Sequence, residues 1–158
     1  MDLSKEIFSS DVIDKIKDQP NLITQLVELL SSNDKDVKHK AWEILQKLIE
    51  NNVIKDKNLI IDLLCYKDEG SRYRVWNFVP KMIEMKIINE NDIKSSKQCL
   101  FQMLTTDNID VRALTWYSTL PQVLPYLNKD EIYQYLKYCK DLLNSSWKDI
   151  IEETCQEF

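Results

Sequence analysis

The feature that most restricts what this 158-residue chain can fold into is its single glycine, Gly70. Average usage of about 7% would give roughly eleven glycines in a chain of this length. Phosphate-binding glycine loops and the sharp turn that carries the nucleophile of many hydrolases each need several positions without a Cβ. The hairpins of all-β proteins also consume glycine. The sequence therefore predicts an all-α protein and argues against those three kinds of site.

The other rare residue types exclude further chemistry. His39 is the only histidine, so the paired-histidine zinc motifs are absent, and the four cysteines contain no C-x-x-C spacing that would indicate structural zinc. The sequence places no serine or cysteine nucleophile with a supporting acid beside His39. We therefore expect a non-enzymatic protein with no catalytic residue, no cofactor and no metal.

Two cysteines could form a disulfide. Cys139 and Cys155 lie at similar distances on either side of a turn predicted near residues 144–146, and intracellular disulfides do occur in hyperthermophiles. Whether they pair stays open from sequence. The prior expectation for each cysteine in the chain, Cys65 and Cys99 included, is a small buried apolar residue.

Charge and hydropathy indicate the surroundings of the protein. The net charge of −5 disfavours a nucleic-acid partner, because phosphate contacts require a basic surface. The first residues contain neither the basic region nor the apolar run of a secretory signal, and no stretch approaches 18 consecutive apolar residues. We expect a cytoplasmic protein that neither spans nor binds a membrane, folded as a single domain over residues 1–158.

The chain contains a degenerate helical repeat. Each unit reads as an apolar helix that ends in leucine, a polar break, and a second helix; Val37, Ser71 and Val111 occupy equivalent positions at offsets of 34 and 40, and a weaker fourth copy begins at Leu143. The predicted first helices are 21–32, 56–66, 92–105 and 130–144, and the predicted second helices are 35–52, 70–87, 109–127 and 147–157. Residues 1–20 are predicted to be a capping segment. We expect Pro80 and Pro121 to kink their second helices without breaking them.

Two of these units resemble a HEAT repeat. The family's pattern is an Asp, then Val-Arg, then an Ala. The first unit matches it with Asp36-Val37-Lys38 followed by Ala41, and the third matches it with Asp110-Val111-Arg112. The second unit keeps only Arg72 and the fourth only Asp149-Ile150. The resemblance covers roughly residues 20–158. It implies a right-handed α-α superhelix, a solenoid of about four HEAT-like, or armadillo-like, helical pairs. It also implies a ladder in which Asp36 and Asp110 pair with Lys38, Arg72 and Arg112 across repeat boundaries.

Three tryptophans repeat with the units. Trp42, Trp76 and Trp116 occupy one equivalent position, at the edge of the apolar stripe of each second helix. We interpret them as packing residues between helical pairs. A column of exposed aromatic rings on which nucleic-acid bases stack is the alternative.

The outward positions of the second helices predict a binding strip for a protein partner. Its residues are Tyr73, Arg74, Asn77, Leu114 and Tyr117, and tyrosine and arginine are enriched at protein interfaces. The function we predict is a protein-binding adaptor or scaffold. The alternative is a nucleic-acid-binding protein related to the HEAT-like DNA alkylation-repair glycosylases, with Arg72, Arg74, Arg112, Trp76, Trp116 and Asp110 in the corresponding roles. No motif of that family maps onto these positions, and the sign of the net charge opposes it.

A second contact surface is expected at the C-terminal end. Tyr133, Tyr135 and Tyr138 cannot share one helical face, so at least one of them must be exposed, and Tyr126 lies just before them. The final helix carries the large apolar residues Trp147, Ile150, Ile151 and Phe158. A homo-oligomer formed through the C-terminal helices is therefore a further expectation.

Overall fold

The computed structural model describes all 158 residues, and its secondary structure is entirely helical. Helices comprise 72% of the chain and there is no strand, so the prediction of an all-α protein is confirmed. The contacts divide the chain into two compact units, residues 1–56 and residues 57–158. We describe each unit by itself, and a single domain over 1–158 stays a prediction.

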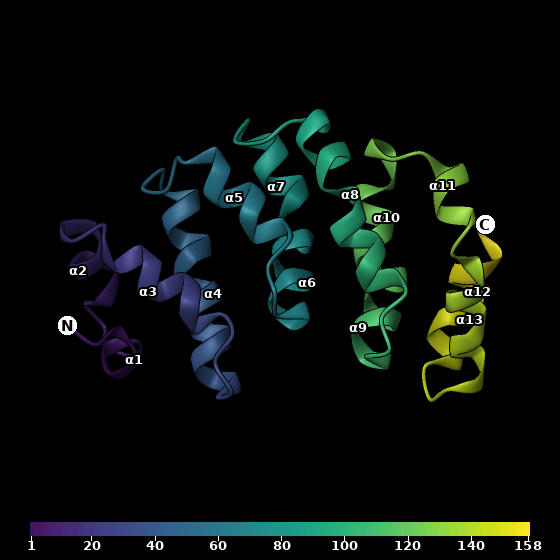
Figure 1. Ribbon diagram of the computed structural model, residues 1–158, viewed down its shortest axis with the longest axis horizontal. Helices are drawn as coiled ribbons and strands as arrows, with labels where there is room; N and C mark the ends of the chain where they lie inside the picture. The colour runs from purple at the N-terminus through teal and green to yellow at the C-terminus, as the bar shows by residue number, and fades with distance from the viewer. The chain divides into compact units, whose positions relative to one another are not determined.

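The first unit contains four helices, drawn from purple to blue in Figure 1. They are α1 (Leu3–Glu6), α2 (Val12–Asp18), α3 (Leu22–Leu29) and α4 (Lys35–Glu50). Helix α4 begins after Asp34, whose carboxylate accepts the free N–H groups of Asp36 and Val37. Helix α3 packs against α4 and α1, and this contact buries Leu26, Ile44 and Leu45.

The second unit contains the remaining helices. They are α5 (Lys57–Leu64), α6 (Glu69–Asn77), α7 (Val79–Glu84), α8 (Glu90–Leu104), α9 (Ile109–Leu114), the π-helix η1 (Thr115–Thr119), α10 (Leu120–Val123), the 3-10 helix η2 (Leu124–Tyr126), α11 (Lys129–Tyr133), α12 (Leu136–Asp141), the 3-10 helix η3 (Leu142–Asn144) and α13 (Lys148–Gln156). Side chains of Asp68, Asn89 and Asn108 cap the N-termini of α6, α8 and α9. The polar breaks of the repeat are therefore helix-start signals.

Within residues 57–158 the first and second helices of the repeat form two layers (Figure 1). Helix α5 contacts α8 in one layer, and in the other α6 contacts η1, which contacts α13. The layers are joined in the same way in two successive pairs. The indole nitrogen of Trp76 donates to the Leu64 carbonyl at 2.7 Å, and that of Trp116 donates to the Leu104 carbonyl at 2.8 Å.

The packing role predicted for the tryptophans is confirmed. Trp76 and Trp116 are fully buried, and Trp42 is buried in the first unit. Each second-layer indole of residues 57–158 satisfies a carbonyl at the end of the preceding first helix, which that helix cannot satisfy itself. A stacking platform for bases would require these rings to be exposed.

The two prolines act differently from one another. The predicted second helix 70–87 ends at Asn77 and restarts at Val79, so Pro80 lies in the first turn of α7, where its missing N–H costs no hydrogen bond. The expectation that Pro80 would kink an unbroken helix is therefore wrong. At Pro121 the chain stays helical but passes through the π-turn η1.

The predicted first helix 130–144 is also divided. Helix α11 ends at Tyr133, α12 begins at Leu136, and η3 completes the segment. The backbone N–H of Tyr135 donates to the Ile132 carbonyl, a tighter bond than that of an α-helix, and it turns the chain between α11 and α12.

All four cysteines form disulfides, and both bonds lie in the second unit. Cys139 and Cys155 join α12 to α13, with Cα atoms 5.9 Å apart, which answers the question that the sequence left open. Cys65, just after α5, and Cys99 in α8 form a second bond, with Cα atoms 5.2 Å apart. The expectation of isolated buried thiols is wrong for all four cysteines. The Cys65–Cys99 pair was missed because the two residues occupy different positions of the repeat, and only the stacking of α5 on α8 brings them together.

Candidate protein-binding surface

The predicted strip lies in the second-helix layer of residues 57–158. Tyr73, Arg74 and Asn77 belong to α6, Leu114 ends α9, and Tyr117 lies in η1. Because α6 and η1 are in contact, the structure brings the two halves of the strip onto neighbouring helices. Tyr117 is the most accessible member, with half of its surface exposed, and the other four residues are half-buried.

Asn77 connects the two helices of the strip. The hydroxyl of Thr119 is fully buried and donates to the Asn77 Oδ1 at 2.7 Å. This bond fixes the separation of α6 and η1, because a buried hydroxyl that lost its partner would be costly. Asn77 therefore positions the strip through its side-chain oxygen. The sequence contained no signal for this role, since Asn77 and Thr119 lie 42 residues apart.

The π-turn determines how Tyr117 is presented. The backbone N–H of Leu120 donates to the Thr115 carbonyl five residues earlier, and the hydroxyl of Thr115 donates to the Val111 carbonyl at 2.6 Å. Pro121 lacks the N–H that an α-helix would direct to the carbonyl of Tyr117. The turn therefore widens there, and single π-turns of this kind are found frequently at functional sites.

Arg72 lies beneath the strip and is not part of its surface. Only 7% of it is exposed, and it reaches into the layer of first helices. Its Nε donates to the Tyr66 carbonyl at 2.7 Å, and its Nη1 donates to Gln102 Oε1 at 2.9 Å and to the Cys99 carbonyl at 3.3 Å. Burial lowers the pKa of the Arg72 guanidinium, and the nearby Glu69 carboxylate opposes that shift. Arg72 therefore links the α5–α6 pair to α8.

Arg112 occupies the equivalent place one repeat later. It is 6% exposed, its Nη2 lies 3.4 Å from Asp141 Oδ2, and its guanidinium carbon lies 6.0 Å from the centre of the Tyr138 ring. Its Nε is buried without a hydrogen-bond partner. Arg112 thus links α9 to α12 with fewer bonds than Arg72 makes to α8.

The predicted ladder is corrected by these contacts. Both arginines do cross to the next helical pair, but Arg112 takes Asp141 as its acid instead of Asp110. Asp110 accepts a hydrogen bond from the Trp147 indole at 3.1 Å. The reason is geometric: Asp110 lies in the exposed first turn of α9, whereas Arg112 is buried two residues later and points toward α12.

The C-terminal tyrosines are separated as their spacing predicted. Tyr133 is 60% exposed, which confirms that one of them must face outward. The Tyr135 ring contacts the Phe101 ring of α8 at a centroid distance of 5.2 Å, and Tyr138 lies under Arg112. In the final helix Ile150 is exposed, whereas Ile151 is fully buried and cannot take part in a contact surface.

No group of three or more histidine, cysteine or acidic side chains is placed to hold a metal ion. His39 lies on the exposed side of α4 in the first unit. None of the helices combines the length and the apolar character that crossing a bilayer requires.

Comparisons with protein-family models, with curated proteins and with solved structures find no match to this chain.

Proposed function

We propose that this protein is a non-enzymatic adaptor or scaffold that binds a protein partner through the second helices of its repeat. The observation that carries the proposal is Tyr117, a half-exposed aromatic side chain on a π-turn, beside Leu114 and next to the helix of Tyr73 and Arg74. Rigid aromatic residues on a defined surface supply much of the binding energy of protein interfaces. The Thr119–Asn77 bond holds this surface in place before a partner binds.

We further propose that the chain is a HEAT-like, right-handed α-α superhelix. The alternation of first and second helices, the two layers within residues 57–158 and the repeated tryptophan and arginine contacts support this assignment. Repeat arrays of this kind stack so that each unit contacts its neighbours, and they present extended binding surfaces.

The nucleic-acid alternative receives less support. That hypothesis assigns nucleic-acid contacts to four residues, among others: Arg72, Arg112, Trp76 and Trp116. All four are buried in contacts between helices. Together with the net charge of −5, this leaves no basic, aromatic groove made of those residues. We therefore favour a protein partner.

A cytoplasmic location remains part of the proposal. Two disulfides in 158 residues fit a cytoplasm only if the source is a hyperthermophile, because thiols are kept reduced in the cytosol of other organisms. The oxidation state of the four cysteines in extracts prepared under thiol-blocking conditions tests this point.

The experiment is affinity purification of the tagged chain from its native host, followed by mass spectrometry. The test variant is Tyr117→Ala, and the matched control is Phe8→Ala, which removes an exposed aromatic side chain of similar accessibility from the first unit. Both variants are first checked for native thermal unfolding. Truncation of a central aromatic contact typically costs 2 kcal/mol or more, about a thirtyfold loss of affinity.

The proposal predicts a protein that co-purifies with the wild type and with Phe8→Ala and is lost with Tyr117→Ala. Recovery of nuclease-sensitive material alone would favour the nucleic-acid alternative. A partner retained equally by both variants would show that the second-helix strip is not the binding surface.

A further inference from the structure

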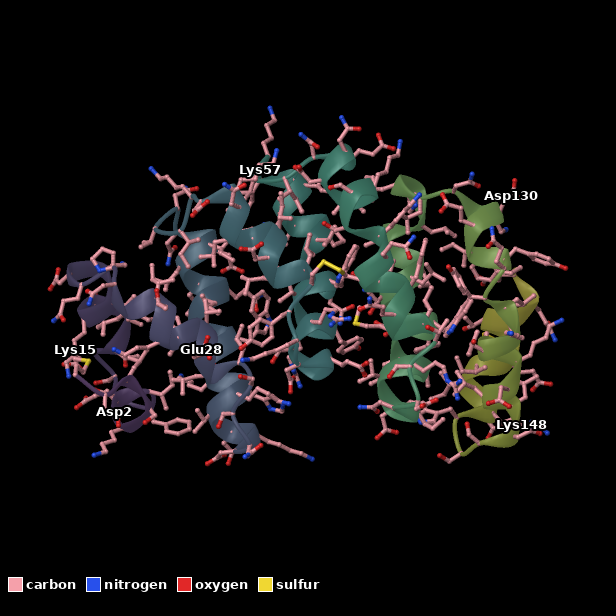
Figure 2. All side chains as sticks on the ribbon, in the orientation of Figure 1. Asp2, Lys15, Glu28, Lys57, Asp130 and Lys148 are labelled. Carbon is pink, nitrogen blue, oxygen red and sulfur yellow. A yellow bond between two sulfur atoms is a disulfide. The ribbon has the colours of Figure 1, made fainter.

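The last helical pair of residues 57–158 carries a hollow on its outer side. It has a volume of about 360 Å3 and lies between α12 and α13. Its apolar lining includes Tyr133, Leu136, Leu143 and Phe158, and its charged lining consists of Lys140 and Glu152. Figure 2 labels Asp130 near the start of α11 and Lys148 at the start of α13, which mark the two ends of this helical pair.

On α12, the hollow lies on the side of the helix away from α9. Tyr138 and Asp141 are the α12 residues that meet Arg112 of α9. Leu136 and Lys140 each stand two residues from Tyr138, about 200° around the helix, and therefore lie on its opposite side. Lys140 on this side is exposed, whereas Phe158 at the edge of the hollow packs edge-on against the buried Trp116 ring of η1. The most exposed large apolar residue of the second unit, Tyr133, lies at the rim of the hollow.

The charges at the hollow are divided between the two helices. Lys140 belongs to α12 and Glu152 belongs to α13. Lys140 and Glu152 both line the hollow, and neither makes an ion pair or hydrogen bond within the chain. One helix thus contributes an unpaired lysine to the hollow and the other an unpaired glutamate, beside the apolar side chains of the lining.

This arrangement is complementary to itself. In a two-fold dimer the same patch is present on both subunits, so a contact from residue i to residue j is always accompanied by one from j to i. If two copies approach with α12 of each facing α13 of the other, Lys140 of each chain meets Glu152 of its partner. The two hollows and the two Tyr133 side chains then close against one another, which removes the exposed apolar surface of Tyr133 from water.

We propose that this face, which we call the α12–α13 face and define by Tyr133, Leu136, Lys140, Leu143, Glu152 and Phe158, binds a second copy of this chain in an isologous dimer. It is separate from the second-helix strip, so the dimer and the adaptor function can be tested independently. The dimer would present two copies of the strip to a partner.

The test is sedimentation velocity on the full 158-residue chain across the micromolar range. The wild type is expected to show a monomer–dimer equilibrium. Lys140→Glu places two acidic residues against each other at each of the two contacts, and Glu152→Lys places two basic residues there. Because like charges that face each other across an interface are strongly unfavourable, each variant is expected to weaken dimerisation more than about tenfold.

The decisive measurement mixes the two variants. Lys140→Glu pairs correctly with Glu152→Lys at both contacts, so the mixture is expected to form a heterodimer although neither variant forms a homodimer. The matched controls, Lys94→Glu on α8 and Glu84→Lys on α7, change the net charge equally at exposed positions away from this face and are expected to leave dimerisation unchanged. All variants are checked for native circular dichroism and thermal unfolding.

Three results would overturn the proposal. The wild type could remain monomeric throughout, the two interface variants could dimerise as well as the controls, or the mixture could fail to associate. Binding of a different protein to this face, with no self-association of the chain, would likewise show that the occupant is not a second copy.

Discussion

Replacing Cys65 and Cys99 together by alanine removes the covalent link between the first helices of two neighbouring pairs. The bond closes a loop with a sequence separation of 34. The loop-closure relation for the unfolded chain then gives a stabilisation of about 3.8 kcal/mol at 25 °C. The same relation gives about 3.1 kcal/mol for Cys139–Cys155, whose separation is 16. The wild type should therefore be more stable than Cys65→Ala/Cys99→Ala by about 3.8 kcal/mol.

The measurement is equilibrium unfolding in urea, followed by far-UV circular dichroism, on the oxidised wild type, the double variant and the reduced wild type. Mass spectrometry with alkylation confirms the number of bonds in each sample. The Cys139→Ala/Cys155→Ala variant is the matched comparison. Because Cys139 and Cys155 are buried, it also loses packing, which adds about 1 kcal/mol to its cost.

The exposure of the cysteine residues also predicts an order of reduction. Cys65 is exposed, whereas Cys139 and Cys155 are buried, so a dithiol reductant should open Cys65–Cys99 first in the folded protein. The reasoning is refuted if the double variant lies within about 1 kcal/mol of a wild type that carries the bond. It is also refuted if all four thiols of the wild type react with an alkylating agent before any reductant is added.

Four further substitutions test the contacts between helices and a charged cap, each by chemical or thermal unfolding. Arg72→Met should lower the free energy of unfolding by about 2–4 kcal/mol, because it leaves two carbonyls and an amide oxygen without their charged donor. The equivalent Arg112→Met should leave the free energy of unfolding nearly unchanged, since Arg112 has a buried Nε without a partner. Equal losses for the two variants would contradict the difference in their bonding. Trp116→Phe should cost about 1–3 kcal/mol through the unpaired Leu104 carbonyl, and a neutral result would show that this bond contributes nothing. For Asp92, burial raises the pKa, but hydrogen bonds from Lys57 and from the Asn89 N–H outweigh it and lower the pKa below its usual value of 3.8. The stabilisation from this carboxylate is therefore fully present above about pH 4 and is lost as the pH falls through the folded-state pKa. Asp92→Asn should destabilise the protein at pH 7 and progressively less in acid. A difference in unfolding free energy between wild type and variant that does not change with pH would contradict this.

The sequence by itself determined the kinds of local structure and their order. One glycine and a regular alternation of apolar helices with Asp- and Asn-containing breaks are local properties, since capping and helix periodicity act over a few residues. They predicted the helix starts at Lys35, Glu69 and Ile109 to within a residue. The burial of the tryptophans followed from the same periodicity.

Tertiary structure decided what joins one helical pair to the next. The Cys65–Cys99 bond, the choice of Asp141 as the partner of Arg112, and the Thr119–Asn77 bond each connect residues 29 to 42 positions apart. Their pairing depends on the axial register between stacked helices, which a shift of one helical turn would change completely and which no local pattern encodes. The same register places Lys140 and Glu152 around one hollow, so the surfaces through which this protein is proposed to act are products of packing between elements that the sequence specifies one at a time.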